Sequence, residues 1–321
     1  MTGGAGFIGS ALCEHFLEND NEVVCLDSLI TGHRKNIGPF LSNPRFSFIE
    51  GDIRDLETCK KACDGVDYVF HQAALGSVPR SIENPARTND INIGGFLNML
   101  VAARDAKVKR FVYATSSSVY GSSQKLPKVE AEIGEPLSPY AVTKLVNEKY
   151  ARVFYDIYGL ETIGLRYFNV FGRRQDPNGA YAAVIPKWVA QMMKHERPVI
   201  NGDGSFSRDF TYVDNVVEAN EKSALAPTPA LPQTGEGGVY NIAYGSNTTL
   251  NELFGILRDN LSKYDPEIAK IEPVYASVRP GDIPHSLASI DKARNLLGYD
   301  PQFNARQGFE LACDWYYHHL R

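Results

Sequence analysis

Two neighbouring stretches, TGGAGFIG (2–9) and EVVCLD (22–27), decide the fold of this chain. The glycines of the first stretch form a G-x-x-G-x-x-G turn that opens a helix. Their missing side chains let a pyrophosphate approach backbone N–H groups at the positive end of the helix dipole. The second stretch is a strand that ends in Asp27, 21 residues after Gly6, where a carboxylate can accept hydrogen bonds from ribose hydroxyls. Because an acid here repels a 2′-phosphate, the pattern predicts a site for NAD rather than NADP.

Strand-like apolar runs recur through the first half of the chain and alternate with helix-length amphipathic segments. The helical segments include residues 94–106 and 140–159, and the second ends on Gly159 in the usual C′ role. Several runs are rich in Val, Ile and Phe, as strands covered by helices on both faces must be. The alternation predicts an α/β fold, a doubly wound parallel sheet of the Rossmann type. The further predicted strands are RFSFIEGD (45–52), YVFHQAA (68–74), RFVYATSS (110–117) and ETIGLRYFNVFG (161–172).

The second half of the chain is less regular and richer in Pro and Gly, with loops such as NGDGSFSRDF (201–210). We expect a smaller C-terminal α/β region that binds the substrate. The Pro-rich stretch 226–238 is too short to link independent domains, so we interpret it as a surface excursion. The predicted division is a dinucleotide-binding domain of residues 1–168 plus 209–244, and a substrate-binding domain of residues 169–208 plus 245–321.

Composition narrows the possible partners. The 33 basic and 38 acidic side chains leave a net charge of −5, which argues against a nucleic-acid or anionic-membrane surface. No stretch approaches the roughly 18 uninterrupted apolar residues of a membrane span, and the N-terminus lacks the basic start of a signal peptide. Five scattered cysteines predict reduced thiols and no metal site. We therefore expect a cytoplasmic protein without nucleic acid, membrane or metal.

One local rule is broken at the N-terminus. The glycine turn normally follows a complete strand, yet only Met1 and Thr2 precede it here. If half of this central strand is missing, backbone N–H and C=O groups on both neighbouring strands are left without a hydrogen-bond partner. Our hypothesis is that the native chain begins several residues upstream, which an intact-mass measurement on the native protein can test.

Tyr140 and Lys144 form a Y-x-x-x-K motif at the start of a predicted helix, so both side chains lie on one face, one turn apart. A free phenol has a pKa near ~10, but a neighbouring ammonium and the positive nicotinamide of oxidised NAD favour the phenolate. The spacing predicts Tyr140 as a general base and Lys144 as the residue that lowers its pKa.

Hydroxyl side chains end the strand that precedes this helix, in TSSSVYG (115–121). Open α/β sheets bind ligands at the carboxyl edge, so a hydroxyl there can relay a proton. We expect Ser118 to bond loop backbone groups instead, and Ser116 to face the ligand.

Taken together, TGGAGFIG, Asp27, GDIRD (51–55), TSSSVYG, Tyr140 with Lys144 and LRYFNVFG (165–172) resemble the extended short-chain dehydrogenase/reductase family over the whole chain. Within that family the chain is similar to UDP-sugar 4-epimerases, above all to those acting on UDP-N-acetylglucosamine and UDP-N-acetylgalactosamine. The closer likeness lies in AALGSVPRSIENP (73–85), SPYAVTK (138–144) and RPGDIPHS (279–286).

The resemblance implies roles for individual residues. Catalysis falls to Ser116, Tyr140 and Lys144. NAD is implied to contact Gly3, Gly6, Phe7, Ile8, Gly9, Asp27, Gly32, Asp52, Ile53, Gln72, Ala73, Ala74, Asn92, Thr115, Tyr140, Lys144 and Phe168. The UDP-sugar substrate is implied to contact Gly76, Ser77, Ser116, Ser117, Tyr140, Asn169, Gln175, Ala183, Val184, Arg208, Arg279, Asp282 and Ser286. A homodimer through 94–106 and 140–159 is implied as well.

The implied reaction is reversible epimerisation at C4 of the sugar through a 4-keto intermediate, with NAD reduced and reoxidised in each turnover. A sugar that must turn over can be gripped only at its nucleotide end. Arg208 and Arg279 suit the pyrophosphate because guanidinium forks bind phosphate oxygens, and Asp282 suits the uridine ribose. Family members restricted to plain hexoses carry a Tyr where this chain has Ser286, so the serine implies room for an N-acetyl group.

Two other functions compete with this interpretation. A nucleotide-sugar 4,6-dehydratase on the same scaffold needs an acid and a base to eliminate water, and its relatives place an Asp-Glu pair where this chain has Ser116 and Ser117. A non-catalytic NAD-sensing scaffold would be indicated by loss of Tyr140, Lys144 or Ser116, and all three are present.

Overall fold

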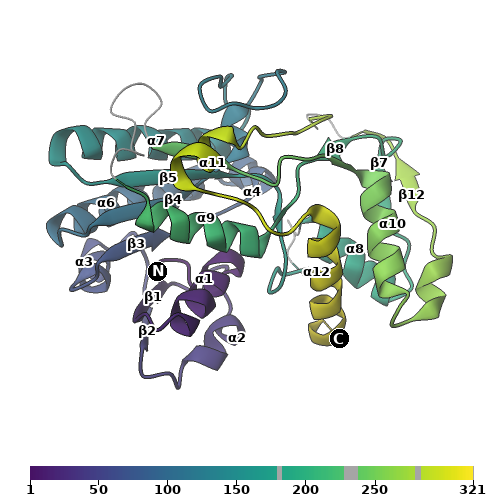
Figure 1. Ribbon diagram of the computed structural model, residues 1–321, viewed down its shortest axis with the longest axis horizontal. Coiled ribbons are helices and arrows are strands. Elements are labelled where there is room, and N and C mark those ends of the chain that lie inside the picture. Colours follow the sequence, from purple (N-terminus) through teal and green to yellow (C-terminus); the bar gives the residue numbers. More distant parts are fainter. Residues whose placement is uncertain (179–182, 228–237, 279–282, 321) are drawn as a thin grey trace.

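The computed structural model describes residues 1–178, 183–227, 238–278 and 283–320. Its main sheet confirms the predicted α/β fold with a parallel sheet (Figure 1). One group of strands runs in the order β10-β5-β4-β3 and a second group pairs β1 with β2, all in parallel. The strands are β1 (Val23–Asp27), β2 (Phe46–Glu50), β3 (Tyr68–His71), β4 (Arg110–Ser116), β5 (Thr162–Tyr167) and β10 (Val239–Ile242).

Thr2 lies between the two groups of strands and connects them. It forms parallel bridges with Leu26 of β1 and His71 of β3. The Gly3 amide donates to the Leu26 carbonyl oxygen at 2.8 Å, and the Gln72 amide donates to the Thr2 carbonyl oxygen at 3.1 Å. The short segment ahead of the glycine turn therefore occupies the central position expected for the first strand.

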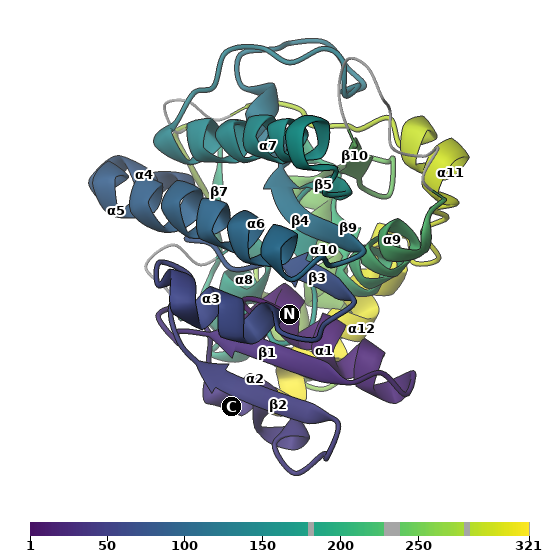
Figure 2. The same ribbon diagram turned by 90° about the vertical axis from the view of Figure 1, so that its left-hand side faces the viewer.

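Helices cover both faces of the sheet. On one face α3 (Leu56–Cys63), α6 (Phe96–Asp105) and α7 (Pro139–Tyr158) pack side by side, as Figure 2 shows. On the other face α9 (Val213–Leu225) packs against α1 (Phe7–Glu18) and α11 (Asp291–Leu297). Gly159 ends α7 with φ +69°, as its predicted C′ role requires. The apolar strands are therefore buried between two helical layers.

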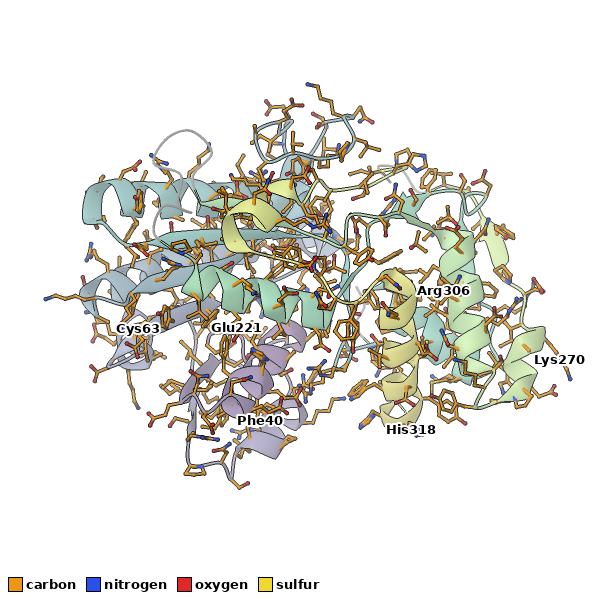
Figure 3. All side chains as sticks on the ribbon, viewed as in Figure 1. Phe40, Cys63, Glu221, Lys270, Arg306 and His318 are labelled. Atoms are coloured by element: carbon orange, nitrogen blue, oxygen red, sulfur yellow. The ribbon has the colours of Figure 1, made fainter. Side chains whose placement is uncertain are left out.

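Three longer helices form a second region, at the right of Figure 1. There α12 (Ala305–His319) packs against α8 (Val184–Met193) and α10 (Leu250–Leu261). Figure 3 shows Arg306 and His318 near opposite ends of α12. Phe171 and Phe309 pack in its core with ring centroids 4.4 Å apart and ring planes tilted by 33°. The predicted domain boundaries stay a prediction. Short strand pairs here are β6 (Val170–Phe171) with β9 (Thr211–Tyr212), β7 (Val199–Asn201) with β12 (Val274–Ala276), and β8 (Ser207–Arg208) with β11 (Thr248–Thr249).

One predicted strand, 161–172, is wrong as a single element. It splits into β5 and β6, and the two belong to different sheets. Asn169 lies between them with φ +35°, outside the extended range that a strand needs. The remaining short elements are α2 (Arg34–Ile37), η1 (Gly38–Phe40), α4 (Val78–Glu83), α5 (Pro85–Asn89), the π-helical η2 (Asp90–Gly95), η3 (Ser117–Tyr120) and η5 (Pro266–Lys270).

The cysteines are free and buried, as their number and spacing predicted. Burial raises the pKa of Cys59 to about 12 and that of Cys63 to about 11, so both thiols stay protonated at neutral pH. Across the described ranges, no helix combines the length and apolar character that crossing a bilayer requires.

Candidate active site

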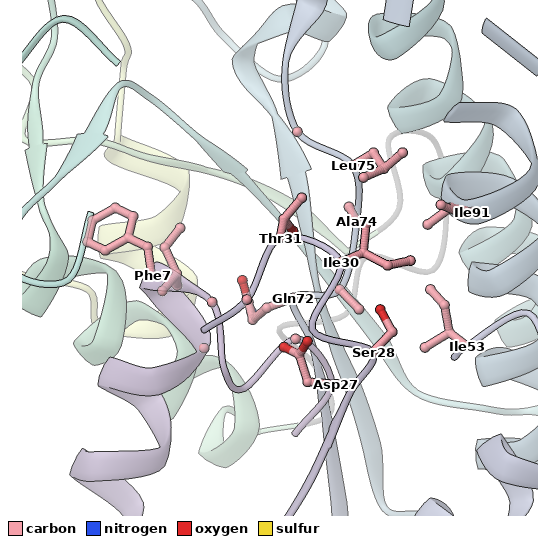
Figure 4. Close-up of a pocket in the computed structure, with 18 of the residues that line it drawn as sticks. Phe7, Asp27, Ser28, Ile30, Thr31, Ile53, Gln72, Ala74, Leu75 and Ile91 are labelled. Atoms are coloured by element: carbon pink, nitrogen blue, oxygen red, sulfur yellow. The ribbon is translucent and has the colours of Figure 1, made fainter. Parts of the chain in front are cut away.

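A cavity of about 440 Å³ opens at the carboxyl ends of β1, β3 and β4 (Figure 4). This is the edge at which open α/β sheets bind ligands. The structure brings most residues predicted to contact NAD to this cavity. Its wall includes Gly3, Gly6, Phe7, Ile8, Gly9, Asp27, Gly32, Asp52, Ile53, Gln72, Ala73, Ala74, Thr115, Tyr140 and Lys144, together with Gly76 and Ser116 from the predicted substrate set.

The glycine turn presents backbone at one side of the cavity. Gly6 is the N-cap of α1, and no side chain caps that first turn. The first backbone N–H groups of α1 are therefore available to a ligand in the cavity, at the positive end of the helix dipole. A Cβ atom on Gly9 would lie 2.1 Å from the Gly3 carbonyl oxygen, so the turn closes only with glycine at that position. This cradle suits a pyrophosphate.

Asp27 ends β1 beside the turn and is buried. Its carboxylate accepts hydrogen bonds from the Ala5 amide at 2.9 Å and the Leu29 amide at 2.8 Å. Burial raises the pKa of Asp27, and the two amides oppose that shift. A carboxylate offers about four acceptor positions, so two remain for ribose hydroxyls.

Asp52 lies in the cavity wall after β2 and is half-buried. The Arg54 guanidinium donates to it at 2.7 Å and 3.1 Å, and this contact lowers the pKa of Asp52. The carboxylate is therefore held ionised and ready to accept a further donor such as an amino group.

Tyr140 and Ser116 meet at the other end of the cavity. Burial raises the pKa of the Tyr140 phenol, while the hydrogen bond with Ser116 opposes the shift. For the protein's own groups, burial outweighs the Ser116 hydrogen bond, and the predicted lowering of this pKa by Lys144 together with oxidised NAD stays a prediction. The Tyr140 amide donates to the Ser81 hydroxyl at 3.1 Å, which joins α7 to α4.

Lys144 is 2% exposed, and its ammonium donates to the Ala114 carbonyl oxygen at 2.8 Å. Burial lowers its pKa to about 8, and the Glu148 carboxylate opposes that shift. The ammonium is thus fixed against β4, one helical turn from Tyr140, as the Y-x-x-x-K spacing predicted.

The predicted roles of two serines are reversed in part. The Ser116 hydroxyl accepts a hydrogen bond from the Ser118 amide at 3.1 Å, so Ser116 serves loop backbone as well as Tyr140. The Ser118 hydroxyl, which we expected to bond backbone, is buried without a partner in the described part of the chain. The tight η3 turn places the Ser116 hydroxyl over the Ser118 amide, which is a local contact between residues two positions apart.

Two predicted cofactor residues do not line the cavity. Asn92 is buried behind its wall, where it accepts from the Leu75 amide at 2.8 Å and donates to the Thr143 hydroxyl at 3.2 Å. Phe168 is fully buried in the core beside Tyr120. Asn92 can therefore support the wall, whereas the Phe168 ring lies in the core and its predicted contact with NAD stays a prediction.

Most predicted substrate residues lie outside this cavity. Ser77 caps α4 by accepting from the Arg80 amide. The Arg208 guanidinium donates to the Pro284 carbonyl oxygen at 3.1 Å, and the Ser286 amide donates to the Ser207 carbonyl oxygen at 3.1 Å. Ser117, Asn169, Gln175, Ala183 and Val184 are likewise described but absent from the cavity wall, whereas Arg279 and Asp282 lie outside the described residues.

Several wall residues were not predicted from sequence. The Tyr167 hydroxyl accepts from the Asn220 amide group at 2.8 Å and faces the cavity, one position before the Phe168 that we predicted. Strand alternation could have indicated it, because adjacent strand side chains point to opposite faces. Arg80 brings a cation to the same wall as Gly76. The others are Leu26, Ser28, Ile30, Thr31, Gly51, Leu75, Ile91, Ala114 and Val170.

Comparison with known proteins identifies the family. The model of the NAD-dependent epimerase/dehydratase family matches residues 1–243. This chain belongs to that family. The UDP-N-acetylglucosamine 4-epimerase from Methanobrevibacter ruminantium, solved with UDP-N-acetylmuramic acid, is 39% identical with a TM-score of 0.89, over 99% of this chain and 97% of that one.

Two further relatives are similar over their whole length. The UDP-glucose 4-epimerase from Thermotoga maritima, solved with UDP-glucose, is 36% identical with a TM-score of 0.88, over 100% of this chain and 98% of that one. A UDP-glucose 4-epimerase from Mycolicibacterium smegmatis is 32% identical over 98% of this chain and 97% of its own. Family membership confirms NAD as the cofactor, and the uncapped turn and Asp27 fit it.

Replacing Gly9 by Ala should lower both stability and bound NAD. The added Cβ meets rigid backbone at 2.1 Å, and overpacking of this kind costs about 1–3 kcal/mol. Urea unfolding and the NAD released on denaturation measure the two effects. Gly255→Ala is the matched control because nothing lies within 4 Å of its Cβ position in α10. Wild-type NAD content in Gly9→Ala would contradict the close-approach argument.

Proposed function

We propose that this chain catalyses reversible C4 epimerisation of UDP-N-acetylglucosamine and UDP-N-acetylgalactosamine, with UDP-glucose and UDP-galactose as poorer substrates. The observation that carries the proposal is the pairing of Tyr140 with Ser116 beside the buried Lys144, at one end of the cavity. The relatives that act on UDP-sugars support the substrate class.

The three residues divide the proton chemistry. Tyr140 takes the proton of the sugar 4-hydroxyl as general base and returns it when the ketone is reduced on its other face. Ser116 donates to the phenolate oxygen and so holds the charge that forms there. Lys144 supplies a fixed positive charge one turn away, which stabilises the same phenolate. Bound NAD supplies the hydride acceptor and donor at this end of the cavity.

The positions of the acidic residues favour epimerisation over dehydration. In the described part of the cavity wall, the carboxylates are Asp27, which ends β1, and Asp52, which follows β2, and both lie on the glycine-turn side. Elimination of water across C5 and C6 needs an acid and a base beside the sugar. At the end of β4, Ser116 and Ser117 occupy the places where the dehydratase arrangement has carboxylates.

Small side chains support the preference for acetylated sugars. Gly76 lies in the cavity wall, and nothing lies within 4 Å of the position its Cβ would take. Ser286 is half-buried and lies beside β8. Because both residues are small, they suit the space that an N-acetyl group needs in both orientations of the turning sugar, provided that the sugar lies between the Gly76 wall and Ser286.

A homodimer through α6 and α7 also belongs to this proposal. The outer face of α7 exposes Val142, Val153 and Ile157, which are 45%, 45% and 67% accessible. At 100° per residue these positions fall within about 60° of one another, so they form one apolar stripe.

We expect the double variant Val153→Glu/Ile157→Glu to sediment as a monomer where the wild type sediments as a dimer. Val199→Glu, which alters an exposed valine elsewhere, is the control. A monomeric wild type would refute the dimer.

Tyr140→Phe should abolish epimerisation and leave NAD bound. The change removes the ionisable oxygen and little volume, and loss of a general base lowers turnover by a factor on the order of 10² to 10⁴. Turnover of UDP-N-acetylglucosamine and the NAD content of the purified protein are the two readouts. Tyr158→Phe, an exposed tyrosine on the same helix, should retain wild-type rates. Near-normal turnover in Tyr140→Phe would refute the mechanism.

Ser286→Tyr should selectively remove activity on the acetylated pair. An aromatic ring fills the proposed space and clashes with the N-acetyl group, a repulsive basis for specificity that exceeds the loss of one contact. The measurement is kcat/KM for UDP-N-acetylglucosamine and for UDP-glucose on the same preparation. An equal fall for both substrates would show that Ser286 has only a structural role.

A further inference from the structure

Asp209 carries a buried carboxylate in the second half of the chain, between β8 and β9. It is 0% exposed. The carboxylate accepts hydrogen bonds from the Tyr244 amide, the Gly245 amide and the Ala288 amide, each at 3.2 Å. A buried carboxylate that bonds only backbone amides fixes the loops that donate to it.

These contacts join three distant segments. Tyr244 and Gly245 follow β10 at the edge of the main sheet, while Ala288 belongs to the segment that precedes α11. The Asp209 backbone joins a third segment, because its carbonyl oxygen accepts from the Asn169 side-chain amide at 3.1 Å. Asp209 therefore ties the main sheet to the C-terminal region at one buried point.

The residues around this point are those for which we propose substrate contacts. Arg208 precedes Asp209 directly, and Ser286 lies two residues before the Ala288 donor. Ser286 is further held by its amide bond to the Ser207 carbonyl oxygen. Asn169 lies between Tyr167 and Val170, both of which line the cavity. One carboxylate thus sets the relative positions of backbone that comes from both sides of the proposed substrate site.

A carboxylate fits this position better than its amide. Among the described residues, the partners of this side chain are backbone N–H donors, and an ionised carboxylate is an acceptor on both oxygens. An asparagine would turn one NH₂ group toward those donors and leave part of the set unsatisfied. Burial raises the pKa of Asp209 to about 7, and the amide donors oppose this shift.

We propose that Asp209 is a positioning residue for nucleotide binding, which holds the backbone beside Arg208, Asn169 and Ser286 in the arrangement that grips the UDP part of the substrate. The inference rests on the proposed function. It assigns Asp209 no contact with the substrate or with NAD.

The test measures UDP binding by calorimetry on the NAD-loaded protein, so no turnover is needed. Asp209→Asn should raise the Kd for UDP at least about tenfold, because a charge-assisted hydrogen-bond set is lost. In turnover it should raise KM for the UDP-sugar while kcat changes less than about threefold and bound NAD stays at the wild-type level.

Glu130→Gln is the matched control. Glu130 is also a buried carboxylate. It accepts a hydrogen bond from the backbone amide of Asn241 in β10 at 2.8 Å. In the described part of the chain its carboxylate accepts from none of the three amides that bond Asp209, those of Tyr244, Gly245 and Ala288. Its Kd for UDP should stay within about twofold of wild type even where its stability falls. A purely structural role for Asp209 predicts the same pattern for both variants.

Asp209→Glu serves as the second variant. It keeps the charge and the acceptors but lengthens the side chain, so the loops must shift and UDP binding should weaken. Wild-type UDP affinity in either folded Asp209 variant overturns the inference. A wild type that binds UDP but epimerises no UDP-sugar overturns the proposed function and leaves the result for Asp209 standing.

Discussion

The carboxylate of Glu148 fixes α7, the helix that carries Tyr140 and Lys144, to β4 and β5, and the arrangement of the candidate active site depends on these contacts. It accepts from the Thr115 hydroxyl at 2.7 Å and from the Arg166 guanidinium at 2.8 Å and 3.0 Å. Both charged side chains are buried, so neither could lose its partner without leaving an uncompensated charge. Because Lys144 lies one turn earlier on α7, the contacts of Glu148 also set the distance between the Lys144 ammonium and the Ala114 carbonyl oxygen.

Backbone groups line one end of the cavity, and side-chain groups line the other. The glycine-turn side is mostly backbone, whose close approaches leave no room for a side chain at Gly3 or Gly9. The opposite end is built from side chains, in which hydroxyl, phenol and ammonium groups are held by packing and by bonds to β4. A cofactor that is regenerated in place needs the rigid side, while proton transfer needs ionisable groups with altered pKa values.

Local sequence predicted the parts of the site that local rules control. The glycine turn, Asp27 at the end of β1 and the spacing of Tyr140 and Lys144 all lie where the sequence placed them, because each depends on residues within a turn or a strand end. What sequence did not show concerns tertiary contacts. Tyr167, which the sequence did not single out, lines the cavity, whereas the Phe168 ring is buried in the core and its predicted contact with NAD stays a prediction.

Sequence by itself determined the sheet, its parallel sense and the cofactor, and it singled out the side chains for which we propose the proton chemistry. Apolar periodicity and glycine positions act over a few residues and need no knowledge of the fold. Only the tertiary structure decided the state of those side chains, because the pKa values of Tyr140 and Lys144 depend on burial among distant residues. It also decided the place of Asp209, whose donors come from segments 35 and 79 residues away along the chain. Contacts over such separations arise from packing, which no local pattern encodes.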